Sequence, residues 1–174
     1  MRGLGRALMI LGALVVAGAL ALFVADSLSA RRLAEAGARA VVALSAAAEE
    51  AGGKGAPTSG PMPELVVDGS SYVGVLRVPA RGIELPVSVD MRRGSAYDGD
   101  LVICVSGDAS RALKAGDSVE LTDTLGNCLA YEVDGWETMD AAAADALGGG
   151  PWPLTLAAPG EGDVLLAARC SLAP

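Results

Sequence analysis

The side chains that could carry covalent chemistry in this chain are three cysteines, Cys104, Cys128 and Cys170, together with the serine and threonine hydroxyls. Histidine is absent from all 174 residues. Without imidazole, no Ser/His/Asp or Cys/His couple can form, and no side chain titrates near neutrality unless its pKa is strongly shifted. Any catalysis would have to proceed without the most common general base.

The cysteines are too widely spaced for a metal motif, and because their number is odd, at most one internal disulfide can form. We expect small, buried hydrophobic side chains instead. Asp98, Asp100 and Asp108 could gather near one loop, but turn aspartates are usually solvated, and their spacing does not match a calcium loop. The sequence therefore predicts neither a metal nor a cofactor.

The charge balance excludes one large class of partner. The chain has 21 acidic and 13 basic residues, which gives a formal net charge of -8, and it contains no basic run. Binding to phosphate backbones needs clustered lysine and arginine. We therefore expect no nucleic-acid partner.

The N-terminal residues have the pattern of a membrane anchor. Arg2 and Arg6 precede residues 7–25, which carry no charge. A stretch of this length approaches the apolar thickness of a bilayer, and its basic flank favours a cytoplasmic N-terminus. We expect a single-pass protein of the cell membrane that contacts the lipid bilayer through residues 7–25, with its C-terminal domain extracytoplasmic. A cleaved signal peptide is the alternative, because Ser27 and Ser29 would fit a cleavage site.

The following segment is rich in alanine and free of helix breakers, so it predicts a continuing helix that acts as a stalk. Its apolar stripe of Leu33, Val41 and Leu44 either binds a partner or belongs to a solvated or self-packing stalk. A run of Gly, Pro and Ser then predicts a linker. The expected segments are a cytoplasmic tip and anchor (1–25), a helical stalk (26–51), a Gly/Pro linker (52–63) and a folded domain (64–174).

The folded domain consists of short Val- and Leu-rich runs separated by turns, which is typical of an all-β barrel or sandwich. The clearest hairpin joins Ser118–Asp123 to Cys128–Val133 through a turn that contains Gly126 and Asn127. Asp140–Leu147 is followed by three glycines and predicts one short helix between strands.

The order of these segments resembles that of the sortases, in particular the class B-like branch. Sortases are membrane-anchored cysteine transpeptidases of the Gram-positive cell wall and cell surface. The resemblance implies an eight-stranded β-barrel with one or two short helices, preceded by the transmembrane helix and the stalk. The matching stretches are YVGVLRVPARGIELPV (Tyr72–Val87), GSAYDGDLVI (Gly94–Ile103), LKAGDSVELTDTLGNCLAYEV (Leu113–Val133), LTL (Leu154–Leu156) and LLAARC (Leu165–Cys170).

The resemblance also locates the catalytic positions of the family, and two of them are replaced. Ser106 stands where the family has the histidine that protonates the leaving amine, and Pro159 stands where it has the nucleophilic cysteine. Arg169 matches the arginine that steadies the oxyanion or positions the substrate. A serine hydroxyl stays protonated at neutral pH, and proline offers no nucleophile. No complete catalytic set remains, and Arg169, Ser106 and Thr155 are left as candidate groove-binding residues.

These replacements favour a catalytically inactive pseudo-sortase, tethered to the membrane, that binds sorting-signal peptides or a partner sortase. One alternative is an active cysteine transpeptidase with an atypical site. Cys104, two residues before Ser106, would be its nucleophile, with a histidine supplied by another chain, although we expect a packed thiol at this position. The remaining alternative is a structural surface protein.

Overall fold

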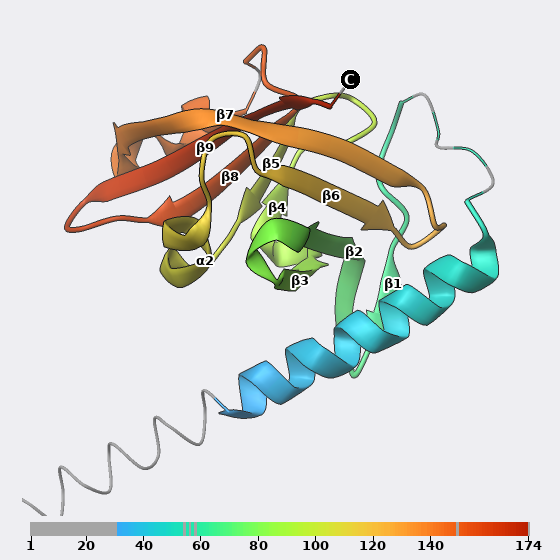
Figure 1. Ribbon diagram of the computed structural model, residues 1–174. Coiled ribbons are helices and arrows are strands. Elements are labelled where there is room, and N and C mark those ends of the chain that lie inside the picture. The colour runs from blue at the N-terminus through green and yellow to red at the C-terminus, as the bar shows by residue number, and fades with distance from the viewer. Residues whose placement is uncertain (1–30, 54, 56, 58, 149, 174) are drawn as a thin grey trace, which may run out of the picture. The chain divides into compact units, whose positions relative to one another are not determined.

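The computed structural model describes residues 31–53, 55, 57, 59–148 and 150–173 (Figure 1). Residues 38–174 form one compact unit, and residues 1–37 belong to another. The anchor expected at residues 7–25 lies outside the described part of the chain. Within that part, no helix is both long and apolar enough to cross a membrane.

A helix covers residues 31–51, as the alanine content predicts. From residue 38 onward its apolar side packs on the sheet, where Val41 and Leu44 are buried beside Val75, whereas Leu33 is exposed. The helix ends at Gly52, whose positive φ allows its N–H to bond the Ala48 carbonyl oxygen at 3.0 Å. This segment therefore contributes a face to the core of the folded unit.

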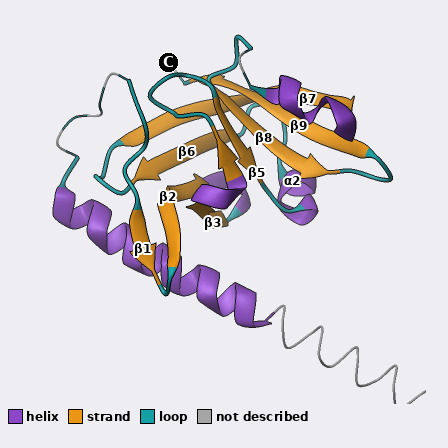
Figure 2. Cartoon of the chain, turned by 180° about the vertical axis from the view of Figure 1, so that it is seen from behind, coloured by secondary structure: helices purple, strands orange, loops and turns teal. Residues whose placement is uncertain are grey.

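Nine strands of the described residues form one mixed sheet that curls into a half-barrel (Figures 1 and 2). The order is β1-β2-β6-β7-β9-β8-β5-β4, with β3 paired to β2 as well. The sheet thus has one strand more than the expected eight, and the strands at its two ends, β1 and β4, are short. The strands are β1 (Leu65–Val67), β2 (Ser70–Val78), β3 (Ile83–Ser88), β4 (Arg92–Arg93), β5 (Leu101–Cys104), β6 (Ser118–Asp123), β7 (Cys128–Asp140), β8 (Leu154–Pro159) and β9 (Val164–Leu172).

The inner face of the curled sheet holds the main core. Alternate strand residues point into it, as the period of two requires. Tyr131, Leu154, Leu156 and Cys170 are among its fully buried members. Met62 also lies in this core with 2% of its surface exposed, although it belongs to the segment expected to be a linker.

In the part of the chain that the structure describes, four short helices connect the strands. The helix expected over Asp140–Leu147 is present as the 3-10 helix η3 (Ala141–Leu147), and Asp140 caps it by accepting a hydrogen bond from the Ala142 N–H at 2.8 Å. Ser106 is followed by the α-helix α2 (Gly107–Ala112), which the sequence analysis did not predict. The other two are η1 (Pro79–Arg81) and η2 (Val89–Met91).

The β6–β7 hairpin forms as the sequence predicts, and its turn is built around the buried carboxylate of Asp123. That carboxylate accepts hydrogen bonds from the Leu125 N–H, from the backbone and side-chain amides of Asn127, and from the Tyr97 hydroxyl. The pKa of Tyr97 is raised, mainly because the hydroxyl is buried and secondly because it contacts this carboxylate. Hydrogen bonds to one carboxylate therefore hold the residues of this turn and Tyr97 together.

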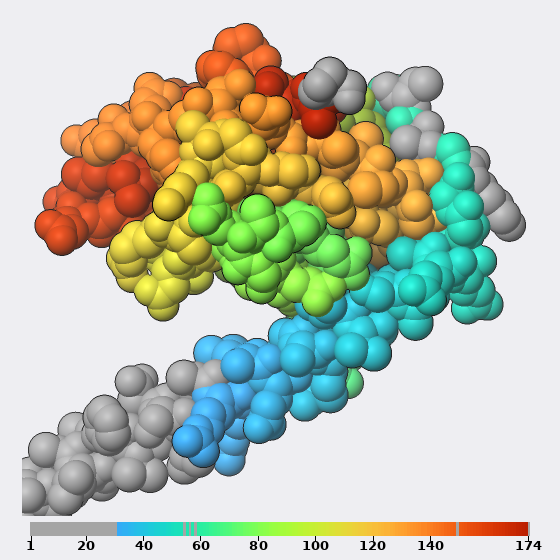
Figure 3. All heavy atoms as spheres, viewed as in Figure 1, coloured from blue at the N-terminus to red at the C-terminus, as the bar shows by residue number. Residues whose placement is uncertain are grey.

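The end of the N-terminal helix docks on this turn. The Gly53 N–H bonds the Leu125 carbonyl oxygen at 3.0 Å. Gly126 approaches so closely that a Cβ there would lie 2.3 Å from the Ala48 carbonyl oxygen. Figure 3 shows the cyan end of the helix in contact with the orange hairpin.

Candidate functional site

The ends of β5 and β8 bring two of the expected site positions together. These strands are parallel neighbours, with Cys104 opposite Ala157, and the Val105 N–H bonds the Ala157 carbonyl oxygen at 2.8 Å. A Cβ at Gly107 would lie 3.6 Å from the Pro159 carbonyl oxygen. The segments that carry Ser106 and Pro159 therefore meet at one edge of the sheet.

Ser106 is exposed and acts as the N-cap of α2. Its Oγ accepts a hydrogen bond from the Ala109 N–H at 3.2 Å, which satisfies one of the backbone donors that a helix leaves unpaired at its start. This arrangement explains why the segment folds as a helix. The Ser106 hydroxyl oxygen is therefore engaged in a structural hydrogen bond.

Pro159 is the exposed last residue of β8 and lies opposite Leu165 on β9. Proline supplies neither a side-chain nucleophile nor a backbone N–H. This corner of the sheet thus offers carbonyl oxygens, the Ser106 hydroxyl and the exposed Cys104 thiol.

Arg169 is positioned away from this corner. In the hairpin register it lies opposite Thr155, four residues before Pro159, which corresponds to about 13 Å along the strand. Its Nη1 donates to the Thr155 Oγ1 at 3.0 Å and to the Leu147 carbonyl oxygen at 3.2 Å. Its Nε and Nη2 contact the Glu137 carboxylate at 3.0 and 2.9 Å. Arg169 and Thr155 therefore form a second group, separate from Ser106 and Pro159.

The outer face of β5, β8 and β9 is covered by η3, which lies against β7 and β9 (Figure 2). Leu147, with 6% of its surface exposed, packs there with Val102, Ala157 and Ala167. This cover could not be anticipated from the sequence, because three separate strands supply the surface beneath it.

The cysteines correct one sequence expectation. Cys170 is buried in the inner core as expected, and burial raises its pKa to about 12. Cys104 and Cys128 are exposed, whereas packed thiols were expected. The reason is local: Cys104 is the last residue of β5 and Cys128 is the first residue of β7, and both side chains face away from the inner core. All three thiols are free.

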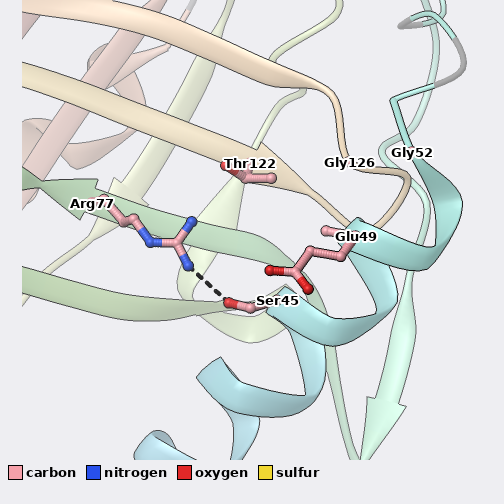
Figure 4. Close-up of a pocket in the computed structure, with 7 residues that line it drawn as sticks. Ser45, Glu49, Gly52, Arg77, Thr122 and Gly126 are labelled. Atoms are coloured by element: carbon pink, nitrogen blue, oxygen red, sulfur yellow. Dashed lines mark hydrogen bonds between the residues drawn. The ribbon is translucent and has the colours of Figure 1, made fainter.

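A polar hollow of about 290 Å3 lies between the N-terminal helix and strands β2 and β6 (Figure 4). Arg77 lies in it and donates to the Ser45 Oγ at 2.8 Å and to the Glu84 carboxylate at 2.6 Å. Glu49 and Thr122 line the same hollow. The sequence did not single out these residues, because they come from distant segments with no shared motif. The observed bonds of Arg77 hold the helix to the sheet.

The three aspartates that could have gathered near one loop, Asp98, Asp100 and Asp108, each contact another protein group. In the described part of the chain, no three Asp, Glu, Cys or His side chains gather closely enough to hold an ion. Asp98 accepts a hydrogen bond from the Gly60 N–H, and Asp100 accepts one from the Ser95 N–H. Asp108 pairs with Arg111 on α2.

Comparison with known proteins identifies the fold. No protein-family model and no curated protein matches the sequence. Among solved structures, the chain is similar to sortase A from Corynebacterium diphtheriae, with a TM-score of 0.51 and 16% identity over 60% of this chain. It spans 62% of the length of that structure. A lid mutant of the same sortase matches 76% of this chain and 92% of its own, with a TM-score of 0.50 and 15% identity. The chain therefore has a sortase-like fold.

Proposed function

From this sortase-like fold, we propose that the chain is a sortase-family protein without transpeptidase activity, which binds an extended peptide at the shared end of β5 and β8. The proposal rests on which residues occupy that corner. The two positions that would hold the proton donor and the nucleophile are close together, but they hold a helix-capping serine and a proline.

The chemistry of transpeptidation explains why these two groups matter. A thiolate must attack the peptide carbonyl carbon, and the departing amine must receive a proton. At this corner Pro159 provides no attacking atom, and Ser106 retains its proton at neutral pH while its oxygen caps α2. The chain has no imidazole to replace either function.

The same corner still supports binding. Cys104, Ser106 and Pro159 are all exposed, and β8 continues for two residues past its pairing with β5. The ligand in this proposal is a sorting-signal peptide, or a partner sortase that carries one. The uncharged segment at residues 7–25 would anchor the protein in the cell membrane of a Gram-positive bacterium, with the folded unit outside.

The test is a titration of the isotopically labelled full chain with sorting-signal peptides. Amide shifts would be recorded, and the same sample would be checked by mass spectrometry. Shifts that cluster around Ser106 and Pro159 with the peptide intact are the expected result. Cleavage of the peptide would refute the loss of activity, whereas a folded spectrum that never shifts would favour a purely structural surface protein.

The exposure of Cys104 favours a second candidate function, an atypical cysteine transpeptidase. Its thiol lies opposite Ala157 at the same edge of the sheet. This activity would need a base from another chain, so it should appear only when a histidine-bearing partner is added. Loss of peptide turnover in Cys104→Ala, with turnover retained in the matched Cys128→Ala, would establish it.

A further inference from the structure

The polar hollow between the N-terminal helix and strands β2 and β6 has walls of opposite charge (Figure 4). Arg77 of β2 forms one wall, and Glu49 of the helix forms the other. Ser45 and Thr122 add hydroxyl groups to the lining. Small-molecule sites usually measure about 300–1,000 Å3. With a volume of about 290 Å3, the hollow is therefore of a size for a small polar molecule.

The Arg77 guanidinium is held in place, but not all of its donors are used. Its Nη2 donates to the Ser45 Oγ at 2.8 Å, and its Nε donates to the Glu84 carboxylate at 2.6 Å. No described residue accepts a hydrogen bond from its Nη1. The side chain is 31% exposed, so an incoming anion meets a guanidinium that is partly shielded from water. Arg77 can therefore bind a carboxylate through the remaining donor while it keeps its contact with the helix.

Glu49 faces this guanidinium without pairing with it. Figure 4 shows the Glu49 carboxylate pointing across the hollow toward Arg77, yet among the described residues Arg77 pairs with Glu84. Glu49 follows Ser45 by four residues, so both side chains lie on the side of the helix that faces the sheet. The hollow thus presents a cation and an anion on opposite sides, and both are accessible to one ligand.

We propose that this hollow binds a small zwitterion of the α-amino acid class. The ligand carboxylate accepts hydrogen bonds from the Arg77 guanidinium, and the ligand ammonium group donates to the Glu49 carboxylate and the Thr122 hydroxyl. A ligand with a single charge leaves one wall of the hollow unmatched. The site is separate from the shared end of β5 and β8, because β7 and β9 lie between β6 and β8 in the sheet. The inference therefore does not depend on the proposed function.

A zwitterion in the hollow joins the helix to the sheet. Ser45 and Glu49 belong to the helix, whereas Arg77 and Thr122 belong to β2 and β6. Because the two sides meet in the folded chain and not in the unfolded one, a ligand that contacts both stabilises the fold increasingly with its concentration. Binding is therefore measurable at the hollow itself and in the unfolding of the folded unit.

The first experiment titrates the isotopically labelled full chain with alanine and records the amide shifts of Gly52, Thr122 and Gly126, which line the hollow. The shifts should saturate with one dissociation constant. Propionate lacks the ammonium group of alanine, and ethylamine lacks its carboxylate. Each should bind about tenfold more weakly, because one charge-assisted hydrogen bond is lost. Equal binding of the three compounds, or shifts that never saturate with alanine, would overturn the assigned ligand.

The second experiment changes one wall at a time. Glu49→Gln removes the charge of an exposed side chain, so the variant should fold and bind alanine about tenfold more weakly. The matched Glu50→Gln removes the neighbouring exposed charge, which does not line the hollow, and should leave the affinity unchanged. Arg77→Lys retains the positive charge but loses the planar fork, so it should also weaken binding. Equal affinities in Glu49→Gln and Glu50→Gln would refute the site, because net charge alone would then explain binding.

Urea unfolding of the same variants gives an independent readout. Alanine should raise the urea midpoint of the wild type and of Glu50→Gln, and it should raise that of Glu49→Gln much less. Propionate and ethylamine at the same concentration control for general effects of a solute on stability. A midpoint that rises equally in all three proteins would show that alanine acts as a general solute, and the proposed site would then be wrong.

Discussion

The docking of the N-terminal helix on the β6–β7 turn should make Gly126 one of the most sensitive positions of the chain. Gly126 has a φ of 80°, a conformation in which an L-residue costs about 1–2 kcal/mol. In addition, an alanine Cβ would lie 2.3 Å from the Ala48 carbonyl oxygen and 2.9 Å from the Gly53 N. Because both contacts are with backbone, no side-chain rotation can relieve them.

The helix end would have to move by about 1 Å to restore ordinary contact distances. That movement breaks the bond between the Gly53 N–H and the Leu125 carbonyl oxygen, a loss of about 0.5–1.5 kcal/mol. It also loosens the packing of Leu44 on Val75. Together with the backbone term, Gly126→Ala should lower the free energy of unfolding by about 2–4 kcal/mol.

Gly69→Ala is the matched control. Gly69 has nearly the same φ, 82°, but a Cβ there meets no atom within 4 Å. This variant should show the backbone term alone, about 1–2 kcal/mol. Urea unfolding, followed by tryptophan fluorescence and by circular dichroism at the same time, measures both variants. If the two lose equal stability, the close approach of helix and turn does not contribute, and the reasoning about docking fails.

Three further predictions concern single side chains. With iodoacetamide at pH 8, mass spectrometry should find Cys104 alkylated in the native protein and Cys170 unmodified until the chain unfolds, because burial raises the Cys170 pKa to about 12; fast native modification of Cys170 would contradict the buried assignment. Asp117→Asn should destabilise the protein at pH 7, because hydrogen bonds from Arg81 at 2.7 and 2.8 Å lower the Asp117 pKa. The advantage of the wild type is complete above the unfolded-state pKa of about 3.9 and is lost as the pH falls through the lower folded-state pKa, so urea midpoints that stay apart at the lowest pH would argue against this pairing. Tyr131→Phe should leave the urea midpoint unchanged or raise the stability by up to about 1 kcal/mol, because the buried hydroxyl has no partner among the described residues; a large loss would mean that the hydroxyl is bonded.

Much of the fold could be predicted from local pattern. The alternation of apolar residues identified the strands, and Gly126 with Asn127 identified the clearest hairpin. Asp140 and the glycines after Leu147 marked both ends of η3. These predictions succeed because a turn or a cap depends on residues that are neighbours in the sequence. The helix α2 was not predicted, although Ser106 offers a good cap, because six residues are too few to show a helical period in the sequence.

Prediction of the candidate site was less complete. Ser106 and Pro159 lie at one corner, since parallel pairing aligns the ends of β5 and β8. Arg169 could not be placed in the same way, because its neighbours depend on the hairpin register, which sets it opposite Thr155. Its pairing with Glu137 on a third strand carries no local signal at all.

By itself, the sequence determined which side chains are available. It contains no imidazole, and it has serine at position 106 and proline at position 159. The tertiary structure alone decided which side chains meet: it exposed Cys104, separated Arg169 from Pro159, and placed Leu147 over the outer face of three strands. The physical reason is that strand register and the covering of a sheet face arise from packing between distant segments, whereas each local stretch of sequence specifies only its own alternation and turns.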